Sequence, residues 1–263
     1  MQSCGGLVDS HRHVPTDGAA DAIEGIARER SFVFATGSAS DWAIVDAVHQ
    51  HRSEDDVMCR FPVGFGFHPW FLSEAEGLES GGTSWIDGLR AKLLERPTAF
   101  VGEIGLDKLR GPPMEIQLAA MAAQVDVAVE LRRPVSVHCV RAWGPMLTFL
   151  TKRSADALPP AFIFHGFSGS PDFVQSLMKM GKRKASRFYF GVAATTTGRL
   201  KDCEKVLSAI PPCRLLLESD SHDTAEAQRV LAESVDAFNS FVPDFASCTT
   251  ANALAVMSPD TWS

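Results

Sequence analysis

The sequence has no C-x-x-C pair among its six cysteines, and no basic-then-apolar segment typical of a secretion signal precedes its first motif. Cysteines scattered in this way are typical of a protein that is kept reduced rather than cross-linked by disulfides. We therefore expect an intracellular protein, cytoplasmic and/or nuclear.

Long apolar runs are absent as well. No stretch approaches the roughly 20 apolar residues needed to cross a bilayer, so we expect a soluble chain with no membrane contact. Internal repeats, low-complexity tracts and Pro/Ser-rich linkers are also missing. Because 263 residues come close to the roughly 250 of one α/β barrel, the sequence predicts a single domain over residues 1–263.

The sequence also lacks a surplus of positive charge. With a net charge of −7, the chain has no overall attraction for a phosphate backbone. Any nucleic-acid substrate would have to be bound by a local basic patch or through bound cations, which invert the local field.

The sequence does contain short apolar runs that alternate with longer stretches of helical spacing, the pattern of βα units. The predicted strands are Gly6–Val14, Ser31–Gly37, Pro62–Trp70, Ala99–Asp107, Val135–Val140, Ala161–Phe167, Arg187–Ala194 and Leu215–Asp220. The predicted helices lie at about 18–29, 40–52, 83–95, 113–131, 142–153, 171–182, 199–208, 224–240 and 247–257. Eight such units predict an α/β fold, a closed (β/α)8 TIM barrel, with Ser73–Ser84 as a surface loop.

Barrel enzymes place their sites at the C-terminal ends of the strands, and polar residues stand at these ends here. The first run ends in His11 and His13, which the period of two puts on one face, with Arg12 on the other. Two such imidazoles can bind one metal ion. An isolated H-x-H is nevertheless more often a pair of ordinary barrel histidines.

Glu103 lies within the fourth run, where an unpaired carboxylate would be costly to bury and a metal ion would relieve the cost. The flanking Gly102 and Gly105 indicate a close approach of backbone or ligand, or plain tight packing. His138 and His165 end the fifth and sixth runs, and two histidines at the same ends of adjacent strands favour a metal site over core packing.

Asp220 ends the eighth run, placed to bind metal and to accept a proton from water, with Glu218 deeper on the same face. The alternative is that Asp220 caps the following helix, unless Asp223 or Thr224 does so. Together the ligand set contains nitrogen and oxygen but no thiolate. It predicts two divalent ions, Mg, Mn or Zn, held by His11, His13, Glu103, His138, His165 and Asp220.

These residues resemble the TatD-related metal-dependent hydrolases, the TatD DNase family of the amidohydrolase superfamily. The similarity is spread over D-S-H-R-H at 9–13, G-F-H-P-W at 66–70, G-E-I-G-L-D at 102–107, P-V-S-V-H at 134–138, F-H-G-F-S-G at 164–169 and L-L-L-E-S-D at 215–220. Gln117, Gln124 and Asn252 also look like that family.

The resemblance implies that His11 and His13 bind one metal, that Glu103 bridges, and that His138 and His165 bind the second. It also implies that Asp220 completes the first subsite and acts as base.

His68, at the end of the third strand, matches a pocket histidine of the family, and we expect it to contact substrate phosphate or support the site. Packing against Pro69 and Trp70 is an equal alternative.

The chain departs from the family in loops that face the substrate. Trp70 stands where a second histidine is common, Val140 where an arginine is common, and Ser221-His222-Asp223 where an R-N-E-P-like segment follows. These departures are similar to a divergent eukaryotic branch. Basic residues expected near the mouth, as candidate phosphate contacts, are Arg12, Lys108, Arg110 and Arg141.

The function that we favour is a phosphodiesterase, a deoxyribonuclease acting on DNA from strand ends through water activated by two metals. One alternative is the hydrolysis of a small amide, lactone or phosphoester. Another is a non-enzymatic scaffold for a protein partner, in which Trp70, Phe71 and Trp143 form an exposed apolar surface.

Overall fold

The computed structural model describes residues 7–13, 33–34, 42, 63–74, 84–257 and 262. The expected helices at 18–29 and, apart from Trp42, at 40–52 lie outside these residues, as does most of the expected loop Ser73–Ser84.

Within the described residues, seven parallel strands form one sheet in which each strand pairs with the next along the chain. They are β1 (Val33–Phe34), β2 (Val63–Phe65), β3 (Phe100–Asp107), β4 (Val135–Val140), β5 (Phe162–Phe164), β6 (Phe188–Val192) and β7 (Leu215–Leu217). This uninterrupted sequential order is the order of a barrel wall.

The first predicted strand completes the wall beside β7. Ser10 N donates to Leu217 O, Asp220 N to His11 O, and His13 N to Ser221 O, so residues 10–13 run along the end of β7. The expected (β/α)8 TIM barrel is confirmed, although this first segment is held by isolated bridges at Asp9 and His13 rather than by a continuous strand.

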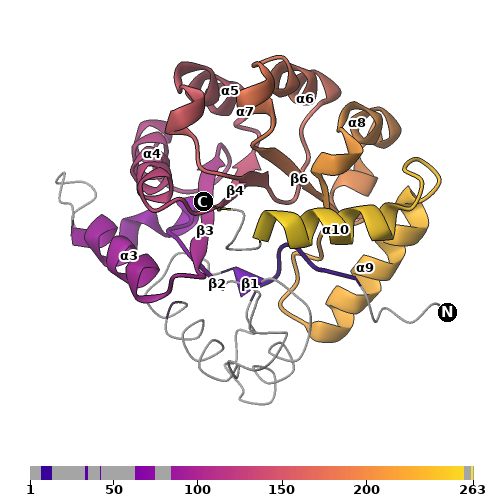
Figure 1. Ribbon diagram of the computed structural model, residues 1–263, viewed down its shortest axis with the longest axis horizontal. Helices are drawn as coiled ribbons and strands as arrows, with labels where there is room; N and C mark the ends of the chain where they lie inside the picture. Colours follow the sequence, from indigo (N-terminus) through magenta and orange to yellow (C-terminus); the bar gives the residue numbers. More distant parts are fainter. Residues whose placement is uncertain are drawn as a thin grey trace.

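Helices surround the sheet as an outer layer (Figure 1). They are α3 (Ser84–Glu95), α4 (Met114–Glu130), α5 (Trp143–Lys152), α6 (Pro171–Met178), α7 (Lys182–Ala185), α8 (Cys203–Ala209), α9 (Thr224–Phe238) and α10 (Phe245–Met257). Short 3-10 helices occur at η2 (Pro69–Glu74), η3 (Ala155–Ala157), η4 (Thr197–Arg199) and η5 (Pro212–Arg214). The main core lies between this layer and the outward side chains of the strands.

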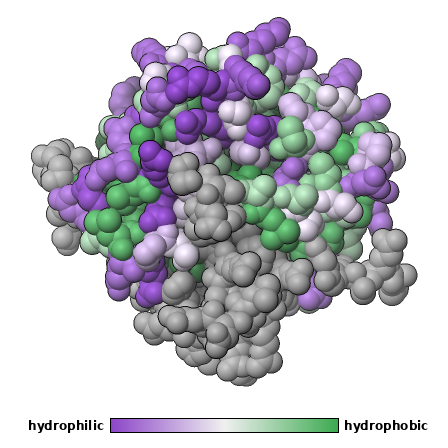
Figure 2. Space-filling model, in the orientation of Figure 1, coloured by the Kyte–Doolittle hydropathy of each residue, from purple (hydrophilic) through white to green (hydrophobic). Residues whose placement is uncertain are grey.

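The last helix, α10, lies across one end of the barrel (Figure 1). Its Ala253 and Val256 pack into a second buried cluster with Phe100 and Ala161, which stand at the beginnings of β3 and β5. This contact closes the N-terminal end of the barrel, so ligands approach from the other end. On the closed face, hydrophobic residues follow α10 and hydrophilic residues cover the outer helices (Figure 2).

Several predicted boundaries were wrong. The strands expected to reach Phe167 and Asp220 end at Phe164 and Leu217. The strand expected to reach Trp70 ends at Phe65, because Pro69 has no N–H for a ladder and begins η2 instead. The helix expected over 171–182 is divided, since Gly181 at φ +88° leaves the helical conformation between α6 and α7. The helix expected from 199 begins at Cys203, after the short η4.

Candidate metal centre

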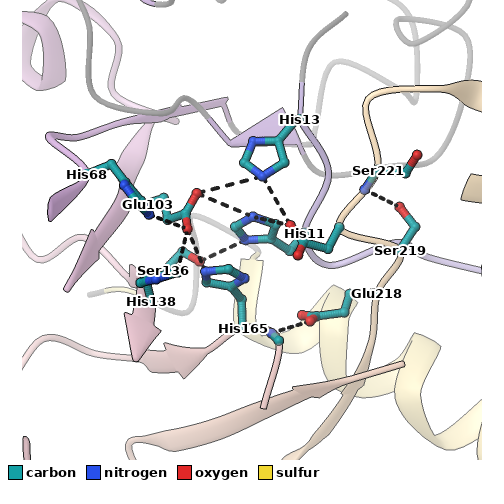
Figure 3. A network of polar contacts seen from close by, with 12 residues as sticks. His11, His13, His68, Glu103, Ser136, His138, His165, Glu218, Ser219 and Ser221 are labelled. Carbon is teal, nitrogen blue, oxygen red and sulfur yellow. Dashed lines mark hydrogen bonds and ion pairs between the residues drawn. The ribbon is translucent and has the colours of Figure 1, made fainter. Parts of the chain in front are cut away.

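Glu103 lies at the centre of the site, surrounded by imidazoles (Figure 3). Its Oε1 is 3.0 Å from His68 Nε2, 3.1 Å from His138 Nδ1 and 2.8 Å from His165 Nε2. The carboxylate is buried. Burial alone would raise the pKa of Glu103, but the surrounding histidines, His68 first, hold it well below its usual range. Glu103 is therefore an ionised acceptor for several cationic or donor groups at once.

A β-bulge in β3 sets the direction of Glu103. The pairing with β4 shifts between Val101 and Glu103, so that Glu103 faces Ser136 and Gly105 faces His138. Gly105 has φ +144°, and a Cβ there would lie 2.0 Å from the carbonyl oxygen of His138. Only glycine permits this approach, which brings Glu103 and His138 together.

His11 and His13 approach the other carboxylate oxygen from the first segment. His11 Nε2 lies 3.9 Å from Glu103 Oε2 and 3.6 Å from Asp220 Oδ1. For His13 Nε2 the same distances are 3.7 and 3.1 Å. Ser136 Oγ is 3.1 Å from His11 Nδ1, which leaves Nε2 of this ring facing the two carboxylates. The two-residue period thus places both imidazoles on one face, as predicted.

Asp220 is not the cap of α9. Asp223 holds that place, accepting a 2.7 Å hydrogen bond from Glu226 N, and Asp220 has a left-handed backbone with φ +54°. Burial would raise the pKa of Asp220, but the hydrogen bond from His13 and the charges of neighbouring histidines hold it below its usual range. Of the two readings left open by the sequence, the structure supports the one that leaves Asp220 available to the site.

The histidines of the site differ in the direction of their pKa shifts. Burial, with the nearby His165, lowers the pKa of His11 well below its usual value, so this ring is neutral, the form that binds metal. Burial also acts to lower the pKa of His138, but hydrogen bonds and charges from Glu103 and Asp107 raise it above its usual value. A metal ion would therefore have to displace a proton from His138 at acidic pH.

Glu218 lies behind the ligand shell (Figure 3). It is fully buried, its Oε1 accepts the N–H of Gly166, and its Oε2 occupies the space where Gly191 would otherwise carry a Cβ. Burial, with the charge of Asp220, raises the pKa of Glu218 well above its usual value. Its burial and these contacts make Glu218 a packing partner of the strands that carry the ligands.

The nitrogen and oxygen atoms fit divalent metal. Three groups of side chains bring one possible ligand atom each within 4.8 Å of one another. The groups are His11, His13 and Glu103; His68, Glu103 and His138; and His11, His165 and Asp220. Buried carboxylates in such a set are costly without a cation, and within the described residues His165 Nδ1 is buried without a hydrogen-bond partner.

The expected ligands each lie near more than one neighbouring ligand, and all six meet at one place. His138 Nδ1 and His165 Nε2 both contact Glu103 Oε1, and His165 also stacks on His11, with ring centroids 3.9 Å apart. The division of these ligands between two ions stays a prediction. His68 lies beside His138 and Glu103. His68 therefore supports the site directly, and its expected contact with phosphate stays a prediction.

The residues expected to contact substrate differ in their exposure to solvent. Arg12 is fully buried and donates to Thr224 Oγ1 at the start of α9, so the expectation that it lies near the mouth was wrong. Its strand position already put it on the face opposite His11 and His13. Lys108 and Arg141 are exposed, directly after β3 and β4, and their contact with substrate stays a prediction.

The expected apolar partner surface is only partly exposed. Trp70, Phe71 and Trp143 are each partly buried, and Trp143 packs against Phe167 and Phe173. Trp70 donates its indole N–H to Asp107. These rings belong to the fold and the site, which removes the main support for a scaffold role.

Asp107 was not among the predicted site residues, although it ends β3 and contacts His138. The two glutamines of α4 that hold the strand ends also had no predicted role. Gln124 exchanges two hydrogen bonds with the backbone of Phe67, and Gln117 accepts from Asp107 N and donates to Asp107 O. Their spacing of seven residues was the signal, since it puts both amides on the same helix face.

Comparison with known proteins agrees with this geometry. The profile of the family described as "TatD related DNase" matches residues 8–241. The chain belongs to this family. Among its relatives, Cut9-interacting protein scn1 of Schizosaccharomyces pombe is 26% identical over 202 residues, 59% of each chain. The 3'-5' ssDNA/RNA exonuclease TatD of Klebsiella pneumoniae is 33% identical over 148 residues, 53% of each chain. The aligned part thus covers only 59% and 53% of these relatives.

Solved structures show the same fold for this TatD-family chain. YjjV, a TatD homologue from Escherichia coli, superposes with a TM-score of 0.72 at 22% identity, over 96% of this chain and 98% of that one. An uncharacterized amidohydrolase from Saccharomyces cerevisiae gives a TM-score of 0.58 at 16% identity, over 97% and 94%. Within the described residues, no helix is long and apolar enough to cross a bilayer.

Proposed function

We propose that this chain is a metal-dependent phosphodiesterase that hydrolyses nucleic acid, with DNA cut from strand ends as the first substrate to test. The observation that carries the proposal is a buried carboxylate, Glu103, set among histidines from four other segments with Asp220 beside them. Relatives named as 3'-5' ssDNA/RNA exonucleases support the choice of substrate.

Two divalent ions fit the donor set. His11, His13 and Asp220 would hold one, His138 and His165 the second, and Glu103 would bridge them. When bound, such a pair supplies positive charge for the scissile phosphate and lowers the pKa of water. The identity and number of the ions are part of the proposal.

The chain's own groups provide the remaining steps. The Asp220 carboxylate accepts the proton of the attacking water, because it is ionised and its side chain remains 32% exposed at the open end of the site. His68 donates a hydrogen bond from Nε2, since its Nδ1 accepts the backbone N–H of Trp70 at 3.1 Å. Lys108 and Arg141 provide positive charge at the mouth for the flanking phosphates.

The test is a nuclease assay on end-labelled single- and double-stranded DNA with Mg, Mn or Zn. We expect the wild type to shorten strands progressively, and His11→Ala and Asp220→Asn to lose activity by roughly 10²-fold or more. Asp236→Asn, an exposed carboxylate on α9, is the matched control and keeps full activity. Intact DNA with every ion, in a protein that measurably binds metal, overturns the nuclease assignment and favours a small ester, amide or lactone.

A further inference from the structure

Asp107, the last residue of β3, is held by four donors. Its Oδ2 accepts from Trp70 Nε1 at 2.7 Å and from His138 Nε2 at 3.1 Å. Its Oδ1 accepts from the backbone N–H groups of Leu109 at 2.7 Å and Arg110 at 3.2 Å. The side chain is buried, and so many donors fix both its charge and its direction.

The Asp107 carboxylate determines which nitrogen of the His138 ring carries a proton. An ionised carboxylate only accepts hydrogen bonds, so His138 Nε2 carries a proton. The other ring nitrogen, Nδ1, points into the site and lies 3.1 Å from Glu103 Oε1. A ligand histidine is usually oriented in this way, by a partner on the nitrogen that does not bind metal.

Trp70 is in turn restrained on two sides. The Arg110 guanidinium lies over its ring, 4.1 Å from the centroid, which restricts rotation of the indole. The backbone N–H of Trp70 donates to His68 Nδ1 at 3.1 Å. Trp70 therefore contacts His68 directly and His138 through Asp107. Within the described part of the chain it makes no hydrogen bond to Glu103.

We propose that Trp70 and Asp107 are positioning residues that fix the Nδ1 atom of His138 as the nitrogen facing the metal, and so set the metal affinity of the Glu103–His138 subsite. The inference rests on the proposed metal centre. The indole N–H acts on His138 through Asp107. Both groups donate to the same oxygen, Oδ2, so the bond from Trp70 fixes the direction of the oxygen that His138 Nε2 contacts.

A purely structural role for Asp107 makes a different prediction. Gln117 already holds the backbone of this turn, donating to Asp107 O at 3.0 Å and to Pro112 O at 2.8 Å. If the side chain only shaped the turn, its replacement would lower stability and leave the His138 tautomer and the metal affinity unchanged. The two roles are therefore separable by measurement.

The first experiment is calorimetric titration of the metal-free protein with Mn²⁺ and Zn²⁺. We expect Asp107→Asn to weaken one class of site by about 10–100-fold and leave the other unchanged, as loss of an outer partner of a ligand histidine does. Trp70→Phe, which keeps the ring and removes the N–H, weakens the same class by less. The double variant is no weaker than Asp107→Asn, because Trp70 acts through Asp107.

The matched control is Trp143→Phe, the same substitution on a partly buried indole with no hydrogen bond recorded among the described residues. We expect it to leave both classes of site unchanged. Equal weakening in Trp143→Phe and Trp70→Phe, or additive losses in the double variant, overturns the proposal. If Asp107→Asn does not fold, Trp70→Phe and its control decide the question.

The second experiment needs neither metal nor activity. In ¹⁵N-histidine NMR spectra of the metal-free protein, at a pH above the titration of its imidazoles, we expect His138 to be protonated at Nε2, and Trp70→Phe to increase the Nδ1-protonated form. A wild-type His138 protonated at Nδ1 overturns the inference. A wild type that binds no metal but has the Nε2 tautomer overturns the proposed function and leaves the positioning intact.

Discussion

The proton on one imidazole decides what His68 can do. Its Nδ1 accepts the Trp70 backbone N–H, so its Nε2 carries the proton and donates toward Glu103 at 3.0 Å. A nitrogen that carries a proton has no lone pair for a metal. His68 thus belongs with the hydrogen-bond donors of the site, even though its ring lies within metal-binding distance of Glu103 and His138.

Replacement of His68 by Gln tests this assignment. The amide retains a donor but cannot place it as the ring does, so we expect kcat to fall by about 10²–10³-fold while the metal content stays at the wild-type value. Elemental analysis and steady-state kinetics on the same preparation measure both. Loss of one metal equivalent would instead make His68 a ligand.

Tyr189 offers a probe away from the site, because it is the only tyrosine of the chain. Burial raises its pKa, against the lowering effect of the Arg214 guanidinium. The absorbance titration should therefore have a midpoint above about 10, and Arg214→Met should move it higher. Because the pKa of Tyr189 is higher in the folded than in the unfolded state, its contribution to the free energy of unfolding is complete below the unfolded pKa. This contribution is lost as pH rises through the folded pKa. A midpoint at the ordinary value contradicts the burial of this ring.

Among the elements, β3 contributes most to the site. It carries Glu103 and ends in Asp107, and its bulge and Gly105 adjust it against β4. Two glutamines of α4 hold the ends of β2 and β3 through backbone hydrogen bonds. The strand ends are thus fixed from the helix layer, which leaves the side chains on the inner face free for chemistry.

Gly105→Ala tests the close contact between β3 and β4. A Cβ would lie 2.0 Å from His138 O on a backbone with φ +144°, so we expect a loss of about 1–3 kcal/mol or more in the free energy of unfolding. Urea unfolding measures it. Gly88→Ala in α3 is the control: apart from its chain neighbours and its own helix, nothing lies within 4 Å of its added Cβ, and a gain of about 0.5–1 kcal/mol is expected. Equal effects of the two variants would contradict the bulge geometry.

At the scale of the whole molecule, the site joins segments that are distant along the chain. His11, His68, Glu103, His138, His165 and Asp220 come from six different stretches of the barrel. Without a cation, Glu103 and Asp220 hold their charges among imidazoles alone. Metal binding should consequently stabilise the entire barrel and not only one loop.

The melting temperature should rise when metal is returned to chelator-treated protein. At a free ion concentration of about 100 times Kd, mass action adds about 2.7 kcal/mol per site. Scanning calorimetry measures the shift, which chelator should reverse. Asp220→Asn should reduce the gain and Asp236→Asn should not. An unchanged melting temperature at saturating metal would show that the ions do not bind the native site.

The net charge of −7 leaves only local positive charge for binding nucleic acid. We expect affinity for single-stranded DNA to depend weakly on salt, with Lys108→Ala and Arg141→Ala each reducing the slope of log K against log salt by about 0.7. Fluorescence anisotropy with the hydrolysis-deficient Asp220→Asn protein measures it. Unchanged slopes would remove these residues from the substrate path.

The sequence alone determined the barrel and the place of its chemistry. Parallel strands bring their C-terminal ends to one edge, so the sequence predicts that His11, Glu103, His138 and Asp220 at those ends meet. The period of two also separated Arg12 from its neighbours. Strand ends were less predictable, since Pro69 and Gly166 turn the chain away before the apolar runs stop.

Only the tertiary structure decided how the ligands are grouped and protonated. His165 stacks on His11, and Trp70 reaches Asp107 across 37 positions. Whether Asp223 or Asp220 caps α9 depended on where the chain turns after β7. Such contacts follow from distances between separate segments, which local periodicity does not encode. The distances between these segments decide which nitrogen faces a carboxylate, and with it which imidazole donates a hydrogen bond and which can bind metal.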